Sequence, residues 1–390
     1  MKDQVFGYFM PMVNLMGSGS AKKIGEQMAI TGKKKAFIVT DKGLMQSGIP
    51  DTIKKYIEEA GFHAVIWDKV CPNPTDKIVH LGLEAYRDNR CDMIISVGGG
   101  SPHDCAKGIK LVADNGGKIN DYEGVDKSTN SPTPLFAVNT TAGTASEMTR
   151  FCIITDTKRK VKMAIVDWRT TPTVSFNDPE LMVAMPKGLT AATGMDALTH
   201  AVEAYVSTIA TPLTDSAALK AIELISVWLR PAVANGSDME ARDQMAYAEF
   251  LAGMAFNNAS LGYVHAMAHQ LGGMYDLPHG VCNAILLPYV SKFNILSKTE
   301  RFADIAVALG EATDDCISVH EAADRAIEAI RKLSADIDIP ANLKLLGVKE
   351  KDLKTMATNA MKDACSFTNP RSATLEDIIE IYRQALMGEE

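Results

Sequence analysis

Two residue pairs with helical spacing are candidates for holding a metal ion. Asp196 and His200 lie four positions apart in a strongly helical segment, so their side chains share one face. His265 and His269 repeat this spacing, and His279 follows them in an expected turn. A single histidine of this kind is more often a hydrogen-bonded core residue than a ligand. Two pairs and a turn histidine in a nearly uncharged region together favour a metal site.

The chemistry of this donor set restricts the ion. One carboxylate oxygen and three imidazole nitrogens, without a thiolate, suit Fe²⁺, Zn²⁺, Mn²⁺ or Co²⁺ and suit Ca²⁺ or Cu⁺ poorly. The residue types alone do not choose among the first four ions.

A second kind of chemistry is indicated in the first half of the chain. Gly98, Gly99, Gly100 and Ser101 follow an apolar run and precede a helix expected to begin near Pro102. Backbone N–H groups and the positive end of a helix can bind a pyrophosphate there. The spacing is not the dinucleotide fingerprint, and glycines of this kind also mark ordinary tight turns.

A second turn strengthens the nucleotide hypothesis. It follows another buried strand and is rich in hydroxyl groups and glycine, with Thr140, Thr141, Gly143, Thr144 and Ser146. Two such turns at strand ends are typical of an open sheet that holds a dinucleotide.

Asp41 is a candidate for choosing between NAD and NADP. It stands at the end of an expected strand, where a carboxylate accepts hydrogen bonds from a ribose diol and repels a 2′-phosphate. Asp41 therefore favours NAD. The alternative is that Asp41 only caps the following helix.

The elements that position these residues divide the chain into two parts. In the first part, short β-branched runs alternate with amphipathic helices, which predicts an α/β domain with a covered parallel sheet. The expected strands are 35–40, 64–67, 93–97, 136–139, 152–155, 161–166 and 173–176, with helices at 49–60 and 75–89. The strands 152–155 and 161–166 should form a hairpin.

The second part is predicted to be all-helical. The expected helices are 190–208, 212–235, 239–259, 262–272, 288–297, 299–309, 319–333, 351–360 and 375–386, with a break at Gly272 and Gly273. We place the boundary at a short connector between two prolines. The prediction is a dinucleotide-binding domain at 1–182 and a metal-binding domain at 183–390.

Composition excludes several classes of protein. The 390 residues carry 40 Lys plus Arg against 48 Asp plus Glu, and this charge of −8 repels nucleic acid and anionic membranes. The longest stretch without these four residue types, 250–275, contains histidine and asparagine, so we interpret it as protein interior. The N-terminal segment lacks a secretory pattern, which predicts a cytoplasmic protein. Seven cysteines without metal-site spacing are expected to be reduced thiols.

Four motifs resemble those of the iron-dependent, group III alcohol dehydrogenases. They are GGGSPHDCAK at 98–107, NTTAGTASEMTR at 139–150, LTAATGMDALTHAVEAY at 189–205 and GYVHAMAHQLGGMYDLPHG at 262–280. Within that family, residues 40–44, 256–258 and 336–340 look most like the 1,3-propanediol dehydrogenases, with the NAD-dependent methanol and ethanol dehydrogenases as relatives. The resemblance implies a dehydroquinate synthase-like fold with an α/β domain, a helical domain and a cleft between them.

The resemblance also implies roles for individual residues. It makes Asp196, His200, His265 and His279 the ligands of Fe²⁺. It also implies a set of residues that line the NAD site, namely Asp41, Asn73, Gly98, Gly99, Gly100, Ser101, Asp104, Thr140, Thr141, Thr144, Ser146, Lys162 and Leu181. His269 is then left for catalysis, as a proton-transfer group or a nicotinamide contact. By analogy of position, Phe151, Cys152 and Phe256 are weak candidates for the alcohol pocket. Family members form homo-oligomers built from dimers, with decamers among the propanediol enzymes.

The function expected from this resemblance is NAD-dependent, metal-dependent oxidation of short-chain primary alcohols or diols, such as 1,3-propanediol, ethanol, butanol and methanol. The metal acidifies the hydroxyl group, and hydride passes to the nicotinamide. The alternatives are a lyase similar to the dehydroquinate synthases, which uses NAD transiently, and a metal-binding structural protein. The lyase needs basic residues for a phosphorylated, carboxylated substrate, whereas residues 191–205 and 259–277 contain no Lys or Arg.

Overall fold

The computed structural model describes residues 5–311 and 317–388. The chain divides into two compact units, residues Met1–Ala184 and Met185–Glu390. In the described part of the chain, no helix combines the length and the apolar character needed to cross a membrane.

Unit 1 contains a six-stranded sheet, ordered β1-β9-β6-β4-β2-β3, in which all neighbouring strands are parallel. Its strands are β1 (Val13–Met16), β2 (Lys35–Asp41), β3 (His63–Val70), β4 (Met93–Gly98), β6 (Leu135–Asn139) and β9 (Val174–Asn177). The central strands β4 and β6 are buried at every position, as is typical of parallel sheets covered on both faces. The predicted α/β class with a parallel sheet is confirmed.

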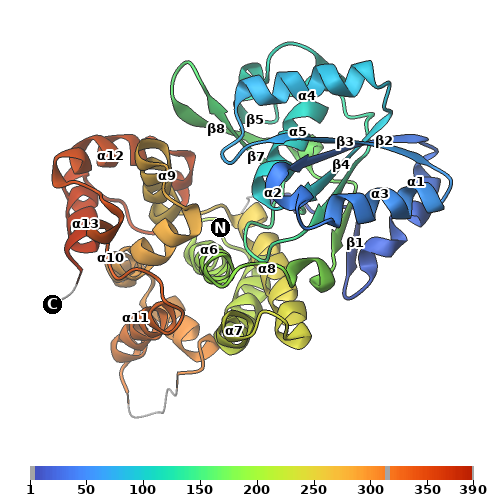
Figure 1. The fold of residues 1–390 in the computed structure, drawn as a ribbon. Coiled ribbons are helices and arrows are strands. Elements are labelled where there is room, and N and C mark those ends of the chain that lie inside the picture. Colours follow the sequence, from blue (N-terminus) through green and yellow to red (C-terminus); the bar gives the residue numbers. More distant parts are fainter. Residues whose placement is uncertain (1–4, 312–316, 389–390) are drawn as a thin grey trace. The chain divides into compact units, whose positions relative to one another are not determined.

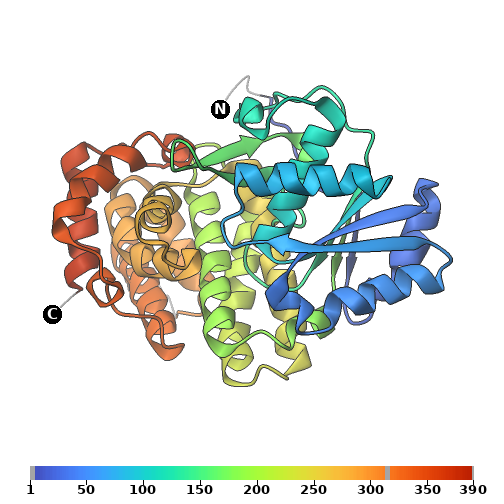
Figure 2. The ribbon, with the colours of Figure 1, turned by 45° about the horizontal axis from the view of Figure 1, so that its top comes forward.

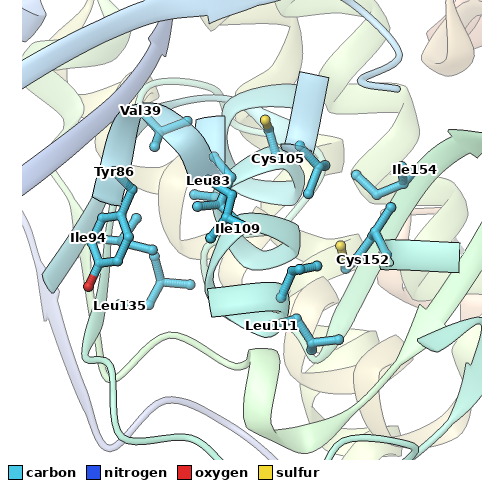
Figure 3. Close-up of a cluster of buried hydrophobic side chains, with 14 of the residues drawn as sticks. Val39, Leu83, Tyr86, Ile94, Cys105, Ile109, Leu111, Leu135, Cys152 and Ile154 are labelled. Carbon is cyan, nitrogen blue, oxygen red and sulfur yellow. The ribbon is translucent and has the colours of Figure 1, made fainter. Parts of the chain in front are cut away.

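Helices cover both faces of this sheet (Figure 1). They are α1 (Ile24–Thr31), α2 (Lys42–Met45), α3 (Ile49–Glu59), α4 (Asp76–Asp88) and α5 (Gly100–Asn115). Alternate strand residues face opposite sides, so Ile38 packs with α1 and α3, whereas Phe37 packs with α4 and α5. Figure 3 shows the second of these clusters, in which Ile109 and Leu83 lie among strand residues such as Ile94.

A second, three-stranded sheet packs beside α5. Its strands are β5 (Gly124–Val125), β7 (Phe151–Asp156) and β8 (Val161–Val166), in the order β5-β8-β7. The antiparallel pairing of β7 with β8 confirms the predicted hairpin. Ile154 and Met163 contribute to the same core cluster as α5.

The described residues of unit 2 form helices joined by loops, without a strand. Its α-helices are α6 (Lys187–Val206), α7 (Pro212–Ala234), α8 (Met239–Ala259), α9 (Tyr263–Tyr275), α10 (His279–Ala308), α11 (Val319–Asp336), α12 (Leu353–Ala360) and α13 (Leu375–Met387). Helices α6, α7 and α8 lie side by side (Figures 1 and 2), and α10 also packs on α6. Every residue of α6 from Thr190 to Val206 is buried, so α6 is the central helix of the unit.

Several expected boundaries are wrong. Helix α9 continues through Gly272 and Gly273 to Tyr275, because neighbouring helices supply packing that outweighs the low helix propensity of glycine. Helix α10 begins at His279, nine residues before the expected start, and continues to Ala308 with one non-helical residue at Lys298. His279 is therefore the first residue of a helix, with Pro278 at the N-cap position, and does not lie in a turn.

Smaller differences concern unit 1 and the cysteines. Helix α5 begins at Gly100 rather than near Pro102, and the short strands β1 and β5 were not expected. Six cysteines are free thiols, five of them buried, in agreement with the expectation of reduced cysteines. The seventh, Cys316, lies outside the described residues.

Candidate metal centre and nucleotide-binding site

One face of α6 supplies three acidic or basic side chains to the interior of unit 2. Asp196, His200 and Glu203 follow each other at intervals of four and three residues, which places them on one face of the helix. Their exposed fractions are 3%, 5% and 3%. Such polar groups are buried only where they have partners, so the face must meet complementary groups on other helices.

Helices α9 and α10 bring those partners. His265 lies in the first turn of α9 and is 1% exposed, and His279 is the first residue of α10. A Cβ added to Gly280 would collide with the backbone carbonyl oxygen of Ala192. Glycine therefore lets the start of α10 lie directly against α6, which brings His279 to Asp196.

The four side chains that the resemblance makes metal ligands converge around the Asp196 carboxylate. Asp196 Oδ1 lies 3.9 Å from Nε2 of His200 and 3.7 Å from Nε2 of both His265 and His279. Donor atoms that share one ion with bonds of about 2.1 Å lie about 3 to 4 Å apart. The donor atoms of Asp196, His265 and His279 all lie within 4.8 Å of one another, which fits a divalent transition-metal ion, and His200 approaches the same carboxylate from α6.

The Asn283 side chain also faces this cluster. Its Nδ2 lies 2.6 Å from Asp196 Oδ1 and 3.1 Å from Nε2 of both His265 and His279. Three acceptor atoms thus point at one electropositive group, the arrangement that a cation requires. Within the described part of the chain, Asn283 Oδ1 is buried without a hydrogen-bond partner.

Charge compensation inside the cluster shifts the pKa values of its members. Burial by itself raises the pKa of Asp196, but His200, His279 and His265 outweigh it and hold that pKa below its ordinary value. Burial lowers the pKa of His265, whereas the nearby carboxylates of Asp196 and Glu203 raise it to about 9. A cation and a proton compete for the same Nε2 lone pair, so acid weakens metal binding.

His269 lies beside the cluster. Its Nδ1 is 2.9 Å from Oδ2 of Asp363, and its ring stacks on the ring of His279 with centroids 5.5 Å apart. The side chain is 18% exposed, against 2% for the side chain of His265. His269 is thus held by a carboxylate at one nitrogen and reaches solvent.

The three weak candidates for the alcohol pocket have different surroundings. Phe256 stacks on the ring of His200, with centroids 4.2 Å apart. Phe151 is half-buried in unit 1, where its carbonyl oxygen accepts a hydrogen bond from Lys107. Cys152 is fully buried in the core cluster of unit 1, and its Sγ donates to the carbonyl oxygen of Asp104. The Cys152 side chain has no exposed surface in unit 1, and its assignment to the pocket stays a prediction.

In unit 1, β4 ends at Gly98 in a backbone conformation that favours glycine. Gly98 has a φ of 148°, and a Cβ there would lie 2.5 Å from the ring of Pro102. Helix α5 then starts at Gly100 with Gly99 as its N-cap, and no side chain caps it. The first N–H groups of α5 can therefore bind an anion.

The second expected turn packs directly on these glycines. A Cβ added to Gly99 would lie 2.9 Å from the Thr141 side chain, and one added to Gly100 would lie 3.2 Å from the Thr144 side chain. The Thr140 N–H donates to the carbonyl oxygen of Gly98. The two turns thus form one surface of glycine backbone and threonine side chains, which fits a pyrophosphate.

A buried network lies behind this surface. The Ser146 hydroxyl donates to Asp104 Oδ1 over 2.7 Å, and Lys107 Nζ lies 3.0 Å from the Ser146 hydroxyl. Lys107 also donates to the carbonyl oxygen of Phe151 over 2.7 Å. Asp104 and Ser146 therefore tie the second turn to α5, in addition to any contact with a cofactor.

The remaining NAD candidates lie in unit 1, on strands, in a loop and in a 3₁₀ helix. Asp41 caps α2, since its Oδ1 accepts the Leu44 N–H over 2.9 Å. Asn73 has a φ of 52° in the loop after β3. Lys162 lies on β8, and Leu181 packs against the core cluster that contains α1 and α3. The structure thus shows the helix-cap role of Asp41, and its ribose role remains a prediction.

Three residues of these sites were missed in the sequence. Glu203 lies seven residues after Asp196 on the same helix face, so periodicity pointed to it. Asn283 lies four residues after His279, but the pair was hidden because His279 was expected in a turn. Asp363 lies 94 residues from His269, and no local pattern connects them.

Sequence profiles of two known domains match the chain. The profile described as "Iron-containing alcohol dehydrogenase" matches residues 11–179, and "Fe-containing alcohol dehydrogenase family, C-terminal" matches residues 190–386. Together they cover most of both units.

Individual proteins are similar over almost the full length. The 1,3-propanediol dehydrogenase of Citrobacter freundii is 55% identical, over 99% of this chain and 100% of that protein. The NAD-dependent methanol dehydrogenase of Bacillus methanolicus is 49% identical, over 97% and 99%. The crystal structure of a 1,3-propanediol oxidoreductase superposes with a TM-score of 0.97 at 54% identity, over 98% of this chain and 100% of that one.

Proposed function

The chain belongs to the family of iron-containing alcohol dehydrogenases, and from this premise we propose that it transfers hydride reversibly between short-chain primary alcohols or diols and NAD. The family membership confirms the resemblance expected from the motifs and the enzyme class, an NAD-linked alcohol oxidoreductase. The family generally implies NAD and Fe²⁺. The individual substrates and the individual residues below are our proposals.

The observation that carries this proposal is the buried cluster of Asp196, His200, His265 and His279. The three imidazoles lie within 3.9 Å of the Asp196 carboxylate, and this donor set has the chemistry of a site for Fe²⁺, with Zn²⁺, Mn²⁺ and Co²⁺ as competitors. A cation held there supplies Lewis acidity, which lowers the pKa of a hydroxyl group and stabilises the alkoxide. The 32% exposure of the His279 side chain leaves the cluster accessible on that side.

The surrounding side chains have separate tasks in this proposal. Phe256 covers the His200 ring and keeps water from that side of the cluster. Asp363 holds Nδ1 of His269, which leaves Nε2 free to take up the proton of the alcohol and pass it to solvent. His269 is the proposed catalytic base, and contact with the nicotinamide ring is the alternative role.

The glycine surface of unit 1 is the proposed NAD site. Gly98, Gly99 and Gly100 admit the pyrophosphate close to the backbone, and the N-terminus of α5 offsets its charge. In this proposal, the Asp41 carboxylate accepts hydrogen bonds from the ribose hydroxyl groups. The methanol dehydrogenase of Bacillus methanolicus, 49% identical, carries NAD dependence in its name, which supports the choice of cofactor.

An uncharged substrate fits the neighbourhood of the cluster. Residues 191–205 and 259–277, which flank the proposed ligands, contain no Lys or Arg, so they offer no partner for a phosphate or carboxylate group. Relatives are named for 1,3-propanediol and methanol. We therefore propose 1,3-propanediol, ethanol, butanol and methanol as candidate substrates, and a cytoplasmic homo-oligomer built from dimers, with a decamer as one form.

A rate screen tests this function. The protein is purified without oxygen and loaded with Fe²⁺, and NADH formation is followed with each of the four alcohols. Steady NADH formation, together with bound iron, supports the proposal. Iron binding without NADH formation from any alcohol, and without NADH consumption by the aldehydes, contradicts it.

A further inference from the structure

We infer that Glu203 is the positioning residue that orients His265 toward the metal ion, an inference that rests on the proposed function. Glu203 lies on α6, three residues after His200 and seven after Asp196. With an exposed fraction of 3%, its carboxylate is buried within the unit. A buried carboxylate needs hydrogen-bond donors, and Glu203 finds them on α9.

Both carboxylate oxygens of Glu203 face donors. Oε1 accepts the backbone N–H of Val264 over 2.6 Å. Oε2 lies 2.6 Å from Nδ1 of His265 and 3.4 Å from the His265 backbone nitrogen. One carboxylate therefore fixes both the backbone and the ring of His265.

These bonds also cap α9 from another helix. The N-cap of α9 is Gly262, which has no side chain to accept the first N–H groups of the helix. A Cβ added to Gly262 would lie 2.8 Å from Glu203 Oε1, so glycine makes room for the carboxylate. The negative charge at the positive end of α9 is favourable and anchors the turn that carries His265.

The same contacts select the tautomer of His265. A carboxylate only accepts hydrogen bonds, so Nδ1 carries a hydrogen, and in the neutral ring Nε2 then keeps its lone pair. The contact of Asn283 Nδ2 with Nε2 agrees with this tautomer, because the amide donates there. Neutral imidazole with a free Nε2 is the form that binds a metal ion.

A glutamine at this position is sterically similar but chemically wrong. An amide has one acceptor oxygen and one donor nitrogen, whereas both oxygens of Glu203 face donors. If the amide nitrogen faces His265, it favours the tautomer with hydrogen on Nε2, which cannot bind the ion. If the amide nitrogen faces Val264, it meets the backbone N–H of Val264, and two hydrogen-bond donors oppose each other at the start of α9.

The test measures Fe²⁺ affinity directly. Glu203→Gln and the wild type are titrated with Fe²⁺ alone under anaerobic conditions, in competition with a chromophoric chelator. We expect Glu203→Gln to bind Fe²⁺ about 10- to 100-fold more weakly, the range found when the group that orients a metal-bound histidine is replaced. Thermal unfolding of each variant without metal is recorded alongside.

Asn369→Ala is the matched control. Asn369 Oδ1 accepts the N–H of Tyr263 over 3.2 Å, so Asn369 caps the same turn of α9. We expect this variant to lose thermal stability but to keep its Fe²⁺ affinity within about twofold of the wild type. The comparison separates loss of the cap from loss of the imidazole contact.

The outcomes distinguish the inference from the proposed function. Equal Fe²⁺ affinity in wild type and Glu203→Gln overturns the inference while the proposed function stands, and so does an equal loss in Asn369→Ala. A wild type that binds no Fe²⁺ overturns the metal site itself. If Glu203→Gln does not fold, Glu203→Asp decides, because its shorter side chain loosens the Nδ1 contact, and unchanged affinity there rejects the inference.

Discussion

The two proposed sites differ in the groups that form them, which are backbone groups in unit 1 and side chains in unit 2. In unit 1, the surface for the pyrophosphate consists of glycine backbone and the start of a helix, with threonine side chains packed on it. In unit 2, the proposed ligands are the side chains of three separate helices, buried with their charges compensating each other.

This difference predicts how each site fails. A site made of backbone has no side chain to remove. It is damaged when atoms are added where two backbone segments pack closely together. A side-chain site is damaged when one member is removed, because the remaining buried groups lose their partner. The predictions below test this contrast.

Removal of a proposed ligand should have the largest effect. His265→Ala deletes an imidazole whose ring stacks on that of His200 at 4.7 Å and leaves Asp196 with less compensation. We expect loss of bound iron and a fall in kcat/KM of more than about 100-fold, beyond the range of outer-shell changes. Metal analysis and steady-state rates measure both. The exposed His320→Ala in the same unit is the control, and full metal content in His265→Ala would remove the ligand assignment.

Loss of the proposed base should separate chemistry from metal binding. His269→Ala should lower turnover about 100-fold, at the low end for general acid–base catalysis, while the iron content stays complete. Asp363→Asn, which weakens the 2.9 Å contact to His269 Nδ1, should lower turnover in the same direction but less. The pH profile of kcat is the readout. Loss of iron in His269→Ala would make this residue a ligand.

Addition of one carbon should damage the site in unit 1. In Gly99→Ala, the new Cβ would lie 2.9 Å from the Thr141 side chain, so the two turns must separate. We expect the KM for NAD to rise about 10-fold, which corresponds to about 1.4 kcal/mol, with unchanged iron content. Gly188→Ala, where a Cβ meets no atom within 4 Å, is the control. An unchanged KM for NAD in Gly99→Ala would argue against a pyrophosphate site on the glycine surface of unit 1.

Two substitutions of Asp41 separate its two roles. Asp41→Ser keeps an acceptor for the Leu44 N–H, and Asp41→Gly costs only a few tenths of a kcal/mol as a cap. If the carboxylate repels a 2′-phosphate, both variants should raise activity with NADP relative to NAD, by about 10-fold. A wild-type ratio in both variants would assign Asp41 to the cap alone.

The smallest effect is expected at Asp156, the last residue of β7, in the β7–β8 hairpin. Hydrogen bonds from the Arg159 backbone and side chain, and from Asn120, hold the pKa of Asp156 below its ordinary value. A carboxyl group with a depressed pKa stabilises the fold above its unfolded pKa of about 4, and this contribution is lost as the pH falls through the folded value. Asp156→Ala should therefore lower Tm by about 2 °C at pH 7. The difference should shrink below pH 4 in thermal melts, and a constant difference would contradict this cause.

Local patterns were sufficient for much of the fold. The strands β2 and β4 are rich in β-branched residues, β6 is largely apolar, and the helix α4 has a clear apolar face, so each was predicted from its own residues. The strand β1 has four residues and β5 has two, which is too short for a periodic signal.

The start of α10 could not be predicted from the residues around it. Pro278 and Gly280 around His279 are typical of a turn. In the structure, Gly280 instead lets α10 approach α6, because a Cβ would collide with the Ala192 carbonyl oxygen. The reason for that glycine lies in a residue 88 positions earlier, which no window of sequence contains.

The sequence by itself determined the residue types of the proposed site, since the spacing of Asp196 and His200 and that of His265 and His269 follows from the helical period. Only the tertiary structure decided which of them meet. In the fold, His279 lies next to Asp196, and His265 pairs with the buried Glu203. His269 pairs with Asp363 beside the cluster. Helical periodicity fixes the direction of a side chain on its own helix, but hydrogen bonds between helices depend on how closely their backbones approach.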